Sequence, residues 1–77
     1  MIRFRVRPAV AEKLARSNVV QRDLAQAIRV SDGYLSQLLK GIRCPGPRVR
    51  DRLASSAPFH DLSFDDLFER VASEATQ

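Results

Sequence analysis

The stretch at residues 21–41, QRDLAQAIRVSDGYLSQLLKG, decides the fold because it contains two apolar patterns that do not continue one another. Leu24 and Ile28 share a face of a first helix, and Leu35 and Leu38 share a face of a second. Each residue advances a helix by about 100°, so one straight helix through both patterns leaves an apolar residue off the common stripe. The stretch therefore predicts two short helices joined by a tight turn.

The turn between these helices has local signals of its own. Val30 is the apolar residue off the stripe, Ser31 is a good N-cap, and Asp32 is favourable in a first helical turn. The run RVSDG also places several poor helix formers in succession, which favours a break at this point. These signals predict helices near residues 21–28 and 31–40.

Two small residues indicate that this pair of helices is compact. Ala25 lies on the inner face of the first helix, where a small side chain lets the second helix cross closely. Gly41 suits the left-handed conformation in which many helices end. The second helix is therefore expected to pack tightly on the first and to end at Gly41.

The remaining segments predict further short helices around this pair. Pro8 and Pro47 each suit the first turn of a helix, because the N–H that proline lacks has no partner there. Ser63 and Asp66 have the spacing of a capping box at the start of a last helix. Five helices are predicted, near residues 8–17, 21–28, 31–40, 47–56 and 63–74. The predicted core consists of Leu14, Leu24, Ala25, Ile28, Val30, Leu35, Leu38, Leu39, Val49, Leu53, Leu62, Leu67 and Phe68.

Length and composition limit the functions open to this chain. With 77 residues it is expected to form a single domain, too small for a cleft between two domains. The only cysteine, Cys44, has no disulfide partner and no second ligand at zinc-site spacing. No apolar run approaches the roughly 18 residues of a membrane span, and the start does not resemble a secretory signal. We expect a cytoplasmic protein without membrane contact, metal or cofactor.

The charge is unevenly distributed along the chain. Residues 1–52 hold twelve arginines and lysines against four acidic residues, a balance of +8, and residues 53–77 hold one against five, a balance of −4. A basic first part with an acidic end predicts that one face meets a polyanion. No nucleophile is paired with a base in the sequence, so an enzyme is not expected.

The residues of the opening stretch resemble the helix-turn-helix of the Cro/C1-type (XRE-like) repressor family. The matching positions are Gln21, Leu24, Ala25, Val30, Ser31, Leu35, Ser36, Leu38 and Gly41, with Pro45 after them. SFDDLF at residues 63–68 is similar to the start of that family's last helix. The resemblance spans about residues 9–70, most of the chain. It implies an all-α fold, a lambda-repressor-like bundle of about five short helices, with the third helix in the DNA major groove.

This resemblance, with the outward direction of some side chains, predicts a DNA-binding site. A glutamine can bond adenine through two atoms, which makes Gln37 the strongest candidate for reading bases. The predicted base contacts are Ser31, Asp32, Gly33, Ser36 and Gln37. The predicted phosphate contacts are Gln21, Arg22, Tyr34, Lys40 and Arg43.

Three residues depart from the family's pattern. Arg29 stands where the family usually has glycine, at a turn position that needs a positive φ, and this costs on the order of 1 kcal/mol. Asp32 and Gly33 stand at positions that commonly meet base edges. A carboxylate is repelled by phosphates unless a cytosine amino group donates to it, and glycine has no side chain to read with.

Two classes of function follow from these observations. The first is a small sequence-specific transcriptional regulator, a phage-like repressor of the bacterial or phage nucleoid, which binds double-stranded DNA as a homodimer. The second is a protein-interaction module, or the antitoxin-like partner of a toxin or another regulator, which keeps the scaffold with weak DNA specificity. Val71 and Ala75 are candidate dimer contacts. The segment IRFRVR at residues 2–7 alternates with a period of two and fits a fraying arm, a basic arm that follows DNA, or an edge strand that pairs in a dimer.

Overall fold

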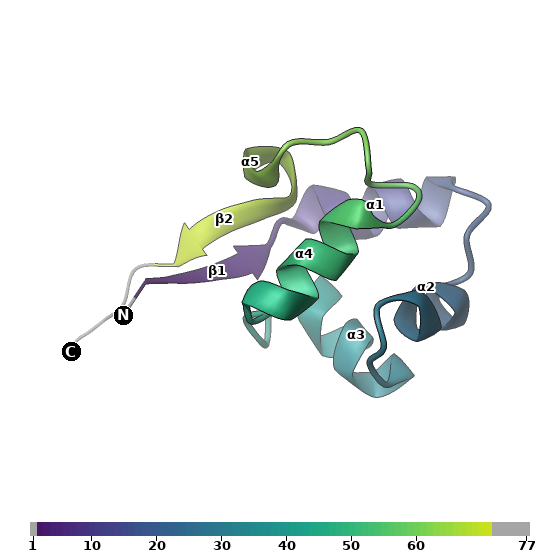
Figure 1. The fold of residues 1–77 in the computed structure, drawn as a ribbon, viewed down its shortest axis with the longest axis horizontal. Helices are drawn as coiled ribbons and strands as arrows, with labels where there is room; N and C mark the ends of the chain where they lie inside the picture. The colour runs from purple at the N-terminus through teal and green to yellow at the C-terminus, as the bar shows by residue number, and fades with distance from the viewer. Residues whose placement is uncertain (1, 72–77) are drawn as a thin grey trace.

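The computed structural model describes residues 2–71 of the chain (Figure 1). This part of the chain contains five helices and one two-stranded antiparallel sheet. In chain order the elements are β1 (Arg3–Val6), α1 (Pro8–Arg16), α2 (Gln21–Ala27), α3 (Asp32–Leu39), α4 (Pro47–Ser55), α5 (Phe64–Leu67) and β2 (Phe68–Val71). The first four predicted helices are confirmed to within one residue at each end.

The helices begin where the sequence signals them. Pro8 and Pro47 occupy the first turn of α1 and α4, and Gly46 is the N-cap of α4. At the start of α3, the side-chain oxygen of Ser31 accepts a hydrogen bond from the backbone N–H of Tyr34 at 3.0 Å. This bond satisfies one of the backbone donors that a helix leaves without an internal partner in its first turn.

The turn between α2 and α3 requires a left-handed residue, as the sequence predicts. Arg29 has a φ of 62°, which makes it the only non-glycine residue with positive φ in residues 2–71. The next amide, that of Val30, donates to the carbonyl of Ala25 at 2.9 Å, which closes the end of α2. Gly41 has a φ of 76° directly after α3, at its predicted place.

The predicted last helix at residues 63–74 is wrong beyond its first turn. Its start is confirmed, because Ser63 and Asp66 form the reciprocal hydrogen bonds of a capping box. The helix ends at Leu67, however, and the chain continues as β2, antiparallel to β1. The paired residues are Arg3 with Val71, Phe4 with Arg70, Arg5 with Glu69, and Val6 with Phe68. Residues 72–74 of the predicted helix lie outside the described residues.

Burial at the inner end of the sheet explains this difference. Val6 and Phe68 face one another across the two strands, and their exposed fractions are only 2% and 1%. The amide of Arg7 donates to the carbonyl of Leu67 at 2.9 Å, which extends the pairing to the end of α5. A strand at this position gives the backbone of β1 hydrogen-bond partners that a helix cannot offer. The expectation of an all-α fold is therefore corrected to a small helical fold with a two-stranded sheet.

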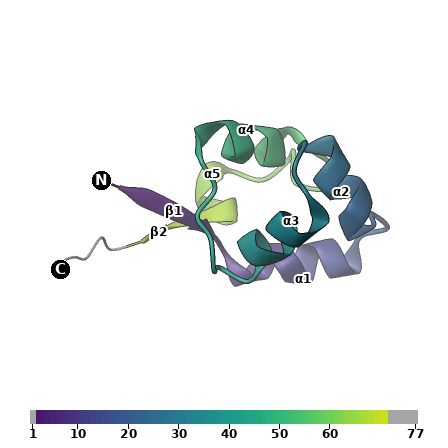
Figure 2. The ribbon, with the colours of Figure 1, turned by 90° about the horizontal axis from the view of Figure 1, so that it is seen from below.

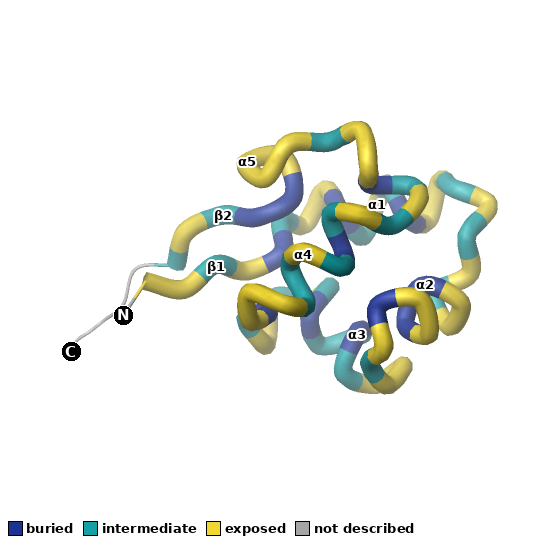
Figure 3. Tube along the Cα trace, viewed as in Figure 1, coloured by how far each residue is buried: buried dark blue, intermediate teal, exposed yellow. Residues whose placement is uncertain are grey.

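The core lies where the helices meet the inner end of the sheet (Figure 3). Its buried members are Val6, Val10, Leu14, Leu24, Ala25, Ile28, Leu35, Leu38, Leu53, Phe59, Leu67 and Phe68. Four residues predicted to be buried, Val30, Leu39, Val49 and Leu62, are only half-buried and pack on the outside of this cluster. Val6, Val10 and Phe59 are buried but were not among the predicted core residues; Val6 lies in the supposed arm and Phe59 in a loop.

The sheet projects away from the helices, so that the outer ends of β1 and β2 lie at one extreme of the molecule (Figures 1 and 2). α5 and the loop before it lie on the opposite side of the molecule from α3 (Figure 1). This arrangement separates the acidic end of the described chain from the helix predicted to meet DNA. Among the described residues, no helix combines the length and the apolar character needed to cross a membrane.

Candidate nucleic-acid interface

The outer face of α3 is directed away from the core. Leu35 and Leu38 are fully buried on one face of the helix, which anchors it. Gly33 and Lys40, seven residues apart and therefore on one line, are exposed on the opposite face. An added Cβ at Gly33 meets nothing within 4 Å. This face is therefore exposed to solvent, and no other element covers it at Gly33.

The residues at the start of α3 are joined to α2 by side-chain hydrogen bonds. The amide nitrogen of Gln21 donates to a carboxylate oxygen of Asp32 at 3.3 Å. This contact brings a predicted phosphate contact and a predicted base contact together at the edge of the α2–α3 pair. Ser31 is exposed, but its hydroxyl oxygen is occupied by capping α3. The carboxylate of Asp32 places a negative charge at this end of the helix.

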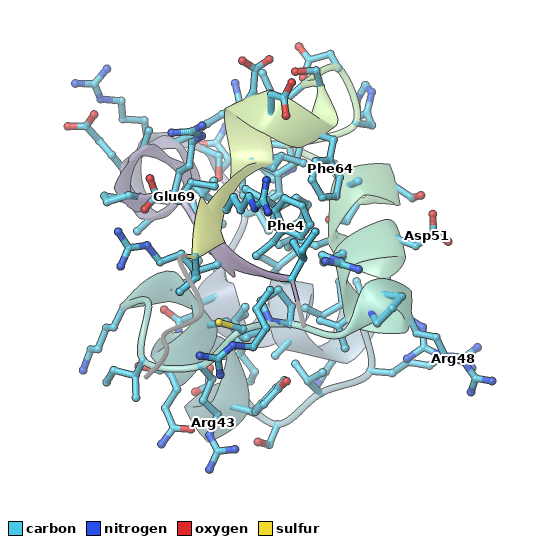
Figure 4. The ribbon with its side chains drawn as sticks, turned by 90° about the vertical axis from the view of Figure 1, so that its left-hand side faces the viewer. Phe4, Arg43, Arg48, Asp51, Phe64 and Glu69 are labelled. Atoms are coloured by element: carbon cyan, nitrogen blue, oxygen red, sulfur yellow. The ribbon has the colours of Figure 1, made fainter. Side chains whose placement is uncertain are left out.

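The residues near the end of α3 form a second connected group. Arg43 donates through Nε to the side-chain oxygen of Gln37 at 2.6 Å. The guanidinium carbon of Arg43 also lies 6.0 Å from the centre of the Tyr34 ring, which is within reach of a cation–π contact. Three predicted DNA contacts, two on the helix and one in the loop after it, are thus held in one cluster. Figure 4 shows Arg43 projecting at the edge of the molecule beside α3.

Ser36 and Arg22 lie apart from this cluster. Ser36 is half-buried and lines a hollow of about 360 Å³ between α1 and α3, together with Gln21 and Lys40. It therefore faces the α1 side of the helix, whereas Gln37 faces the side of the sheet. Arg22 is exposed in the first turn of α2.

No family model, curated protein or solved structure gives a significant match to this chain. The ten predicted contacts lie on α2, on α3 with its N-cap Ser31, and in the segment that follows α3.

Positively and negatively charged side chains are distributed unevenly around this surface. Lys40 and Arg43 are exposed at the end of α3. Among residues 61–71, the acidic side chains lie instead on α5, on the loop before it, and on β2. The end of α3 therefore carries the cations Lys40 and Arg43, whereas its start carries the carboxylate of Asp32.

Sequence reasoning missed the contribution of β1 to this side of the molecule. Arg3 and Arg5 line a hollow of about 600 Å³ together with Gln37 and Arg43. The signal was present in the alternation of IRFRVR, which puts its arginines on one face of a strand. The arginine face of β1 lies beside α3 only because β1 pairs with β2, and the alternating pattern does not show this pairing.

The described residues contain no group of three or more histidine, cysteine, aspartate or glutamate side chains placed to hold a metal ion. Cys44 is half-buried in the loop after α3, at the edge of the same hollow.

Proposed function

We propose that this chain is a DNA-binding transcriptional regulator that resembles the Cro/C1-type repressors and inserts α3 into the major groove of an operator. The observation that carries the proposal is the position of α3. Its inner face is anchored by Leu35 and Leu38, its outer face is open at Gly33, and Lys40 and Arg43 follow at its end. An exposed helix of this kind, preceded by a crossing helix, is the arrangement of helix-turn-helix readers.

The proposal divides the contacts into two groups. It assigns Gln21, Arg22, Tyr34, Lys40 and Arg43 to phosphates and Ser31, Asp32, Gly33, Ser36 and Gln37 to base edges. Gln37 is the leading reader, because Ser31 caps α3 and Ser36 is turned toward α1. Contacts to phosphates give affinity that depends on salt, whereas contacts to bases give sequence preference. The two groups are therefore distinguishable by experiment.

The first test is a salt titration of binding to a duplex of about 20 base pairs. Binding through phosphates gives a steep negative slope of log K against log salt concentration, of about 0.9 for each phosphate neutralised. Lys40→Ala lowers this slope by about one unit and weakens binding equally for all sequences. Lys13→Ala, which removes the same charge from α1, serves as the control. Absence of binding even in low salt contradicts the proposal.

The second test measures sequence preference. It starts with the selection of bound sequences from random DNA. Gln37→Ala is expected to remove preference at one or two base pairs of the selected site. Arg43 holds the oxygen of Gln37 in the structure, so Arg43→Ala changes affinity and preference together, and the double variant is not additive. Equal loss at selected and random DNA for Gln37→Ala removes this residue from the readout group.

Two residues at the start of α3 favour an alternative function. Asp32 is acidic, and Gly33 has no side chain with which to contact a base. This surface suits a protein partner that presents a cation better than it suits a phosphate backbone. The chain then acts as an interaction module or as the antitoxin-like partner of another protein. Asp32→Asn separates the two functions, because removal of a negative charge strengthens binding to random DNA if α3 enters the groove.

We also propose a homodimer, since one recognition helix reads too few base pairs to select a genomic site. Val71, at the half-buried outer end of β2, remains a candidate contact, whereas Ala75 lies outside the described residues. Footprinting should show two half-sites with centres about 10 base pairs apart. Val71 also lines the hollow that contains Arg3 and Arg43, so Val71→Glu is assayed by sedimentation without DNA, where it should reduce dimer formation at unchanged fold stability. A single protected half-site for the unmodified protein overturns the dimer.

A further inference from the structure

The sheet has two chemically different faces. Phe4 and Val6 of β1 are on the face that packs toward α4 and the core. Arg3 and Arg5 occupy the alternate positions and therefore lie on the other face. Figure 4 shows the same division, because Phe4 lies on the α4 side of the sheet and Glu69, the partner of Arg5, lies on the opposite side.

The arginine face of the sheet forms one wall of the hollow beside α3. This hollow has a volume of about 600 Å³ and lies between β1, the side of α3 and the loop after it. Tyr34 and Gln37 line its α3 side, and Arg43 lines its loop side. Its walls thus come from segments at residues 3–5, 34–37 and 41–44, which only the folded chain brings together.

The lining of this hollow is cationic. Its residues include three arginines and no acidic residue. One of the three, Arg5, forms an ion pair with Glu69 across the sheet, but Arg3 has no ion pair within residues 2–71. A hollow of similar size, about 580 Å³, lies between α1 and the loop before α5 and is lined by Glu12, Lys13, Arg16 and Asp66. That second hollow is balanced in charge. A hollow between β1, α1 and the end of α3 is lined by Arg5 and Lys40 without an acidic residue, and the hollow beside α3, with three arginines, holds more positive charge than either.

The polar groups of this hollow are also held in place before a ligand arrives. Arg43 is fixed by its hydrogen bond to Gln37 and by its position over the ring of Tyr34. The Arg5–Glu69 ion pair joins two strands that are already paired in the backbone. Side chains held in this way lose less conformational entropy when they bind an anion.

We propose that this hollow binds a phosphate of the DNA backbone, and that Arg3 is a phosphate-contacting residue supplied by the sheet. The inference rests on the proposed function, and extends the interface from α3 to β1. Arg43 and Arg3 line the same hollow, so a DNA strand that contacts Arg43 in the loop after α3 also comes within reach of Arg3. The sheet is thereby a second contact to the backbone, separate from the helix that reads the bases.

The test compares two arginines on opposite faces of the same sheet. Arg3→Ala and Arg70→Ala each remove one exposed charge, but Arg70 pairs with Phe4 and lies on the face away from the hollow. The measurement is the salt dependence of binding to a random 20-base-pair duplex. Arg3→Ala should lower the slope by about one unit, whereas Arg70→Ala should leave it near that of the unmodified protein. Equal urea midpoints for both variants establish that the fold is unchanged.

The outcomes separate this inference from the proposed function. If Lys40→Ala lowers the slope but Arg3→Ala equals Arg70→Ala, α3 binds DNA and the phosphate site in the hollow is overturned. If the unmodified protein binds no DNA, the proposed function fails and the site fails with it as a DNA contact. A nuclear magnetic resonance titration of the unmodified protein with inorganic pyrophosphate adds an independent readout. Shifts concentrated at residues 3–5 and 41–44 support the site, and shifts spread evenly over all arginines contradict it.

Discussion

The contacts within the α2–α3 pair join residues that are close in the sequence, whereas the contacts within the β1–β2 sheet join residues that are far apart in it. In the helix pair, Ser31 caps the amide of Tyr34, three residues away, and Gln21 reaches Asp32 across eleven residues. In the sheet, Arg5 reaches Glu69 across 64 residues. The helix pair is thus specified by its own sequence, whereas the sheet exists only when the two ends of the chain have met.

The two regions also differ in what their side chains contribute. Across the sheet and α5, Phe4 and Phe64 meet edge to face at a centroid distance of 4.9 Å, and the guanidinium of Arg50 lies 5.1 Å from the Phe4 ring. Aromatic contacts of this kind add to the free energy of burial alone. The large aromatic side chains of the sheet and α5 therefore help to offset the entropy of closing a long loop, whereas the helix pair joins segments that are close in the chain.

The largest expected effect is at the inner end of the sheet. Phe68→Ala removes a side chain that is 1% exposed and should lower the free energy of unfolding by about 3–5 kcal/mol. Val71→Ala, at the other end of the same strand, should change it by less than about 0.5 kcal/mol. Urea denaturation measures both. Similar small losses for the two variants would mean that β2 does not enter the core.

The second effect tests the close crossing of the helix pair. Ala25 is buried at 2% exposure, and Ala25→Leu adds volume to a packed contact, which should cost about 1–3 kcal/mol. Ala27→Leu makes the same change two residues later, at an exposed position, and should be close to neutral. Unchanged stability of Ala25→Leu would show that the two helices cross with room to spare.

The range of the contacts explains which parts of the structure the sequence alone could predict. The bounds of α1 to α4 and the cap at Ser31 depend on neighbours in the chain and were predictable from them, whereas the left-handed conformation of Arg29 was expected from the resemblance to a family that has glycine there. Whether Phe68 lies in a helix or a strand was not predictable, because the sequence FERV at residues 68–71 fits a helical stripe and a strand equally well. Only the unpaired backbone of β1, more than 60 residues earlier, decides between them.

The same reason limits what could be predicted of the candidate site. The residues of α3 and the loop after it were accessible through their spacing and their resemblance to a known motif. The arginines of β1 were visible in the sequence as an alternating pattern, but the sequence did not show where in the fold they lie. Their place beside Gln37 and Arg43 follows from the pairing of β1 with β2, which no local signal shows.

The third expected effect is a gain in the free energy of unfolding, whereas the first two are losses. Arg29 adopts a φ of 62°, which glycine tolerates without the steric cost that other residues have. Arg29→Gly is therefore expected to raise the free energy of unfolding by up to about 1 kcal/mol. Gln26→Gly, on the exposed side of α2, is the control and should lower it by about 0.5–1 kcal/mol. Destabilisation by both variants would show that Arg29 is not strained in the turn.

The smallest effect lies at the start of α5 and depends on pH. The amide and hydroxyl of Ser63 hydrogen-bond with Asp66, and these bonds, with a minor contribution from Arg7, lower the pKa of the Asp66 carboxyl below its ordinary value of 3.8. A carboxyl whose pKa is lower in the folded state contributes stability above its unfolded-state pKa and loses it as pH falls through the folded-state pKa. The difference in unfolding free energy between the unmodified protein and Asp66→Asn should therefore be constant at neutral pH and shrink below about pH 5. Asp65→Asn removes the neighbouring charge without touching the capping box, and urea denaturation at several pH values should show no comparable shrinkage for it. If the two variants have the same pH dependence, the capping box does not stabilise the ionised form of Asp66.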